Sequence, residues 1–151
     1  MKSWGSIEEV LDFAIGEEEK SFQFYTDLSQ QMEEPALRET LIGFAAEEQR
    51  HKERLLALKQ SGVELHPSRV EALDLKMAEY VVPIETRTDM SYEEILTMAM
   101  RREKAAHDLY LDLAAGAADP GIRDAFLALA QEESNHKLHF EAEYDERLKD
   151  N

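Results

Sequence analysis

Hydrophobic residues recur every three or four positions along most of the chain, which predicts long amphipathic helices. The expected helices cover residues 6–31, 35–60, 91–116 and 120–148. Ser6 and Ser91 each precede a glutamate by three residues, the pattern of a capping box at a helix N-terminus. Pro35 and Pro120 stand where proline is favoured, at the first position of a helix. The pattern therefore predicts an all-α protein.

The first and last pairs of helices are two copies of one sequence. Residues 6–55 align with 91–140 without a gap, and 16 of the 50 positions are identical, whereas unrelated helical sequences of this composition would share about 7–10%. Short links make each pair an antiparallel hairpin. The link over 61–90 is long enough to run the length of a bundle, with a short helix expected over Ser68–Tyr80. We predict one domain over 1–151, a four-helix bundle with a long crossover between helices 2 and 3.

Each apolar stripe of these helices becomes polar near its middle. The polar positions are Glu18, Glu48, His51, Glu103, Glu133 and His136. A buried carboxylate is costly unless it is protonated, paired or bound to metal, and no basic residue lies in the stripes. Residues equidistant from a hairpin turn meet at one level, and a histidine three residues after a glutamate shares its helix face. The six side chains are therefore expected to converge.

Four carboxylates and two imidazoles form a ligand set for two metal ions. Four negative charges balance two divalent cations, and mixed oxygen and nitrogen ligands suit iron, manganese or zinc. A glutamate from each of two helices and Glu-x-x-His from each of the other two is the pattern of dinuclear sites in helical bundles. We expect two metal ions per chain, and iron, zinc and manganese all suit these ligands.

The spacing of these residues resembles that of a known family. The matching elements are Glu18-(x6)-Tyr25, Glu48-Gln-Arg-His51, Glu103-(x6)-Tyr110 and Glu133-Ser-Asn-His136. They resemble the ferritin-like di-iron carboxylate proteins and, within them, the rubrerythrin-like group. The resemblance implies that Glu48 and Glu133 bridge the metals, that Glu18 and Glu103 are terminal ligands, and that His51 and His136 bind one metal each.

The chain departs from typical rubrerythrins at two points. It has no cysteine, so it lacks the Cys-rich rubredoxin domain, and we expect a separate electron donor or reductant. Ala106, and its repeat mate Ser21, stand where rubrerythrins carry an additional glutamate one turn after the third-helix ligand, so the ligand set is more similar to that of bacterioferritin.

Composition limits the partners. The net charge is −16, from 33 acidic and 17 basic residues, which disfavours nucleic acid. No apolar run approaches the 18 residues of a membrane span, and the N-terminus has no secretion signal. We expect a cytoplasmic homodimer.

The leading interpretation is a di-iron oxidoreductase that reduces peroxide or dioxygen. The alternatives are a protein that only sequesters metal and a structural bundle with a relic site. Tyr25 and Tyr110 are candidate catalytic residues that would hydrogen bond a ligand carboxylate, with plain core packing as the alternative. His107 and His139 are expected at the surface or beside a ligand, and not as ligands themselves. His66 in the crossover is expected to be solvated, and the flanking acids are expected to face solvent: Glu17, Glu19, Glu47 and Glu132.

Overall fold

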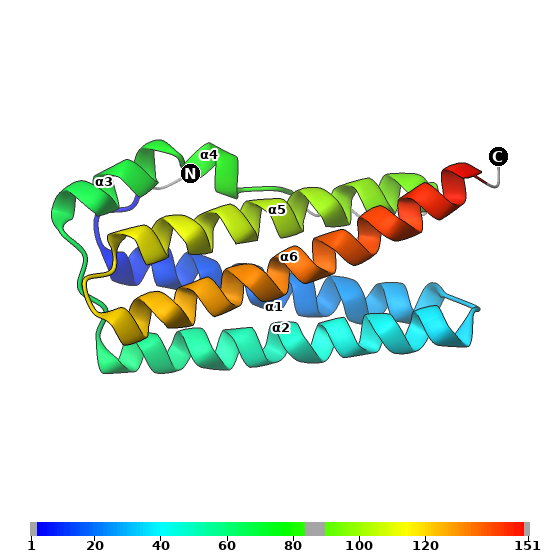
Figure 1. Cartoon of the computed structure of the whole chain (residues 1–151), viewed down its shortest axis with the longest axis horizontal. Helices are drawn as coiled ribbons and strands as arrows, with labels where there is room; N and C mark the ends of the chain where they lie inside the picture. Colours follow the sequence, from blue (N-terminus) through cyan, green and yellow to red (C-terminus); the bar gives the residue numbers. More distant parts are fainter. Residues whose placement is uncertain (1–2, 84–89, 150–151) are drawn as a thin grey trace. The chain divides into compact units, whose positions relative to one another are not determined.

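The computed structural model describes residues 3–83 and 90–149, which contain helices and no strand. The helices are α1 (Ile7–Gln31), α2 (Pro35–Ser61), α3 (Pro67–Leu75), α4 (Met77–Tyr80), α5 (Tyr92–Gly116) and α6 (Pro120–Lys149) (Figure 1). Each end of the four long helices lies within one residue of its predicted position, so the predicted all-α class is confirmed. Two compact units, Met1–Val70 and Glu71–Asn151, are described below one at a time.

The first unit is built on the hairpin of α1 and α2, called the first hairpin. The Ser6 hydroxyl accepts a hydrogen bond of 3.3 Å from the Glu9 amide at the start of α1. Gly62 ends α2 with a φ of +87°, a conformation that favours glycine, and its amide donates to the Leu58 carbonyl. Leu11 and Leu55 are buried where the apolar stripes of the two helices meet.

The second unit is built on the hairpin of α5 and α6, called the second hairpin, with α4 packed beside α5. The capping box predicted at Ser91 is present, with Glu94 as its partner. At the start of α6, Asp119 Oδ1 accepts hydrogen bonds from the amides of Gly121 and Ile122, at 2.7 and 3.2 Å. The buried face of the hairpin includes Leu96 and Phe140.

The expected short helix over Ser68–Tyr80 is divided into α3 and α4 at Lys76, whose φ of −97° and ψ of 5° leave the helical region. The Tyr80 hydroxyl donates a 2.5 Å hydrogen bond to Asp112 Oδ2, and Lys76 Nζ lies 2.8 Å from the same oxygen. Burial and this hydrogen bond raise the pKa of Tyr80, so its hydroxyl remains a donor that ties α4 to α5. The part of the crossover at 84–89 lies outside the described residues.

The helices of residues 3–83 and 90–149 include none that is long and apolar enough to cross a membrane.

The start of α6 gives a stability test with a matched control. Replacing Asp119 with Ala removes the oxygen that caps two helix amides, and we expect the free energy of unfolding to fall by about 1 kcal/mol. Glu34, its repeat mate at the start of α2, makes no side-chain capping hydrogen bond, so Glu34→Ala should change stability much less. Chemical denaturation of both variants measures the difference. Equal losses would show that the cap at α6 contributes nothing specific.

Candidate metal centre

The first hairpin brings Glu18, Glu48 and His51 together, and we call these residues the first half-site. Glu18 comes from α1, and the other two come from α2. Their relative exposures are 2%, 0% and 0%. His51 Nδ1 lies 3.5 Å from Glu18 Oε2 and 3.6 Å from Glu48 Oε1. One ligand atom from each of the three residues fits within 4.8 Å of the others.

The second hairpin repeats this arrangement with Glu103, Glu133 and His136, which we call the second half-site. Glu103 lies on α5 and the other two lie on α6. All three are at most 2% exposed, and His136 Nδ1 lies 3.7 Å from Glu103 Oε1. Their ligand atoms also lie within 4.8 Å of one another. Each hairpin therefore assembles two carboxylates and one imidazole, as the sequence predicted.

The separations within the half-sites suit shared metal coordination. Distances of 3.5–3.7 Å between imidazole nitrogen and carboxylate oxygen exceed those of a good hydrogen bond. Two ligand atoms that each lie about 2.1 Å from one ion, in tetrahedral geometry, are roughly 3.4 Å apart. In both half-sites the histidine atom that lies 3.5–3.7 Å from a carboxylate oxygen is Nδ1. The donor set and its spacing can thus hold a metal ion.

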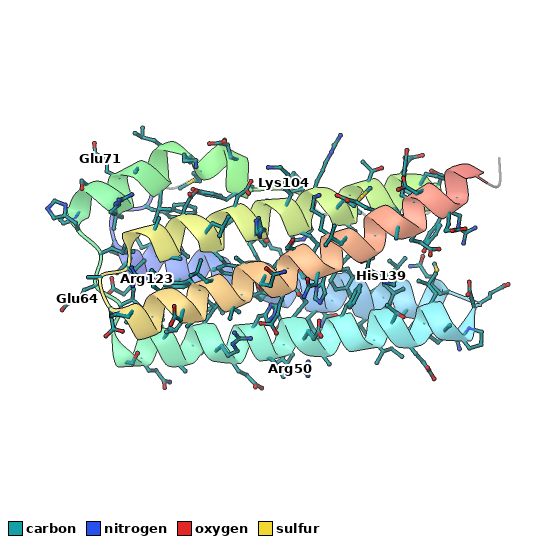
Figure 2. All side chains as sticks on the ribbon, viewed as in Figure 1. Arg50, Glu64, Glu71, Lys104, Arg123 and His139 are labelled. Carbon is teal, nitrogen blue, oxygen red and sulfur yellow. The ribbon has the colours of Figure 1, made fainter. Side chains whose placement is uncertain are left out.

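Charged residues next to the half-sites vary in exposure. The side chains of Glu19 and Glu47 are 43% and 36% exposed, so both reach solvent as expected. The Glu17 side chain is only 16% exposed, so that expectation was wrong for Glu17. Glu132 is half-buried. The basic residues Arg50 and Lys104, labelled in Figure 2, have side chains that are 60% and 65% exposed and lie outside the half-sites.

The two candidate tyrosines are both buried. Tyr25 and Tyr110 are each 1% exposed. The Tyr25 ring lies beside Phe24 and Phe44, with ring centroids 5.3 and 6.0 Å away. At the repeat mates of these two phenylalanines the second hairpin has leucines. Burial is compatible with both a hydrogen-bonding role and core packing, so the catalytic role of the tyrosines stays a prediction.

The three histidines outside the half-sites differ. His66 and His139 are exposed, as expected, and His66 Nδ1 also accepts a hydrogen bond from the Ser68 amide at the start of α3. His107 is half-buried, and its Nδ1 lies 2.8 Å from the Ala130 carbonyl oxygen. The repeat could not indicate this contact, because the repeat mate of His107 is Phe22, whose side chain has no hydrogen-bond donor.

A second feature that the sequence analysis missed is the burial of Arg102. This residue is 9% exposed, and its Nη1 donates a 3.3 Å hydrogen bond to the Val82 carbonyl. Arg102 is adjacent in sequence to Glu103, yet its guanidinium donates to Val82 in the crossover. A basic residue flanked by charged neighbours has no sequence signature of burial.

Comparison with protein families gives one result that covers both hairpins. A family model described as Rubrerythrin matches residues 9–144, a range that includes all six half-site residues. A search of curated proteins found no match, and a search of solved structures found none either. The family match spans most of the chain and accounts for the helical fold, the repeated hairpins and the buried carboxylates and histidines. The chain belongs to the rubrerythrin family, a ferritin-like di-iron carboxylate family.

Proposed function

We propose that the two half-sites act together as one dinuclear centre, and that the protein is an oxidoreductase that reduces peroxide or dioxygen. The observation that carries the proposal is the duplicated cluster: each hairpin buries two carboxylates and one imidazole with their ligand atoms within 4.8 Å. Two such clusters supply four negative charges, which two divalent cations neutralise. Membership of a di-iron family favours iron as the metal, with zinc and manganese as alternatives.

The residues divide into three roles in this proposal. Glu48 and Glu133 would bridge the two metals, whereas Glu18 and Glu103 would be terminal ligands. Each histidine would bind one metal through Nδ1, the atom that lies nearest to a carboxylate in both hairpins. Tyr25 and Tyr110 would hold ligand carboxylates in place by donating a hydrogen bond from the phenol.

The chemistry follows from the charge and the surroundings of the half-sites. Two bound ferrous ions would supply one electron each, enough to convert one peroxide and two protons into two waters. The buried helix faces keep the ligands in position and limit the access of water. These 151 residues include no cysteine, and we propose that a separate reductant or electron-donor protein supplies the electrons that restore the ferrous state.

The expected assembly and location remain part of the proposal. We propose a homodimer that works in the cytoplasm, where small reductants and electron-carrier proteins are available. The net charge of −16 favours a basic surface on a donor protein and disfavours nucleic acid.

Metal analysis of paired glutamate variants tests the ligand assignment. Glu47 and Glu48 are neighbours that point about 100° apart on α2, and Glu132 and Glu133 repeat this relation on α6. We expect Glu48→Ala and Glu133→Ala to lose at least one of about two bound irons per chain. Glu47→Ala and Glu132→Ala should retain both, because their side chains lie off the ligand face. Similar metal loss in all four variants would refute the assigned helix face.

Peroxide titration of the anaerobic ferrous protein separates catalysis from storage. We expect one equivalent of peroxide to oxidise two irons per chain, because each iron gives one electron. Added reductant should then support repeated turnover, which is measured as the continued consumption of peroxide. A protein that only sequesters iron would bind the metal yet consume peroxide no faster than the same amount of iron in buffer, and this outcome would contradict the proposed activity.

A further inference from the structure

We infer that His107 is a positioning residue that holds the second half-site in register, an inference that rests on the proposed metal-binding function. His107 lies one turn after Glu103 on α5. Its hydrogen-bond partner, Ala130, lies one turn before Glu133 on α6. A single side chain thus joins the two helices of the second hairpin one turn from both glutamates of the half-site.

The hydrogen-bond partner of His107 determines which of its ring nitrogens carries a proton. A carbonyl oxygen can only accept a hydrogen bond, so the Nδ1 atom 2.8 Å from the Ala130 oxygen carries a proton. Both the neutral Nδ1–H tautomer and the doubly protonated ring can donate this hydrogen bond. Because the acceptor belongs to the α6 backbone, the contact restrains the helix itself and not a flexible side chain.

The first hairpin joins its helices by different means. Lys52 Nζ on α2 lies 3.0 Å from Glu19 Oε2 on α1, and Lys59 Nζ lies 2.6 Å from Asp12 Oδ1. The repeat mates of His107 and Ala130 are Phe22 and Ala45, and phenylalanine cannot donate a hydrogen bond. Ion pairs between partly exposed side chains therefore connect α1 and α2 near the first half-site.

The second hairpin cannot use the equivalent ion pair. The repeat mates of Lys52 and Glu19 are Lys137 and Lys104, which carry the same charge. Each is instead paired with an acid one turn along its own helix, Glu141 for Lys137 and Asp108 for Lys104. Those pairs do not connect α5 with α6. The His107 hydrogen bond supplies a connection between the helices at this level of the second hairpin.

Register matters because the half-site takes ligands from both helices. Glu103 comes from α5, whereas Glu133 and His136 come from α6, so a slide of one helix along the other separates the ligand atoms. Loss of groups that orient metal ligands typically lowers metal affinity by about 10-fold to 100-fold. A half-buried hydrogen bond to the backbone is also screened by salt much less than exposed ion pairs are.

Cobalt(II) titration of variants with one half-site disabled tests the inference. His51→Ala removes a ligand of the first half-site, so the remaining cobalt reports on the second. In this background we expect His107→Phe, which copies the first repeat, to weaken cobalt binding by about tenfold. His107→Gln should restore much of the affinity, since its amide can donate to the same carbonyl. His139→Phe, a change at an exposed position on α6, is the control and should have no effect.

The same substitutions in a variant whose second half-site is disabled show whether the effect of His107 is specific to the second half-site. In His136→Ala, where the first half-site remains, His107→Phe should weaken cobalt binding much less, because Glu133 is the one proposed ligand of that metal that belongs to the second hairpin. Equal weakening in both backgrounds, equal weakening by Phe and Gln, or no weakening by Phe in the His51→Ala background would each overturn the positioning role. If neither background binds cobalt while the parent protein also fails to bind it, the proposed metal function itself is wrong, and the inference falls with it.

Discussion

The burial of four carboxylates and two imidazoles among apolar helix faces is the constraint on which the rest of the structure depends. All six residues are at most 2% exposed. A buried carboxylate is costly unless another charge compensates it, and carboxylates gathered close together repel one another. Divalent cations remove both costs at once. The same six residues would therefore destabilise a metal-free bundle and stabilise a metal-bound one.

Because of this constraint, the middle of each long helix carries polar half-site residues, the positions on either side carry apolar core residues, and the ends carry caps or turns. Apolar residues such as Leu11 and Leu28 in the first hairpin, or Leu96 and Leu113 in the second, are buried on either side of the half-site residues. The packing of these apolar residues contributes the favourable free energy of folding that the half-site residues do not contribute without metal. Caps and tight turns at the ends, including Asp119 and Gly62, define where each helix begins or ends. All six half-site residues lie on helices, so helix geometry determines their positions and no loop residue is among them.

Most of the fold and the half-sites could be predicted because their signals are periodic and duplicated. Helix ends follow from capping residues and proline, and the ligands follow from glutamates in otherwise apolar stripes. The features that the sequence did not reveal depend on contacts between elements. The break at Lys76, the burial of Arg102 and the contact of His107 with Ala130 each involve a partner far along the chain or a local conformation. Lys76 lies outside both repeats, and the repeat mates of Arg102 and His107 are Glu17 and Phe22, which could not have indicated these contacts.

The central claim is that six buried residues hold two metal ions in one centre. Anomalous X-ray diffraction from crystals of the iron-loaded protein, recorded at the iron absorption edge, tests it most directly. The account predicts two anomalous peaks per chain about 3.5–4 Å apart, one beside Nδ1 of His51 and the other beside Nδ1 of His136. Iron bound only to surface carboxylates, or two irons in separate sites more than about twice that distance apart, would contradict the account.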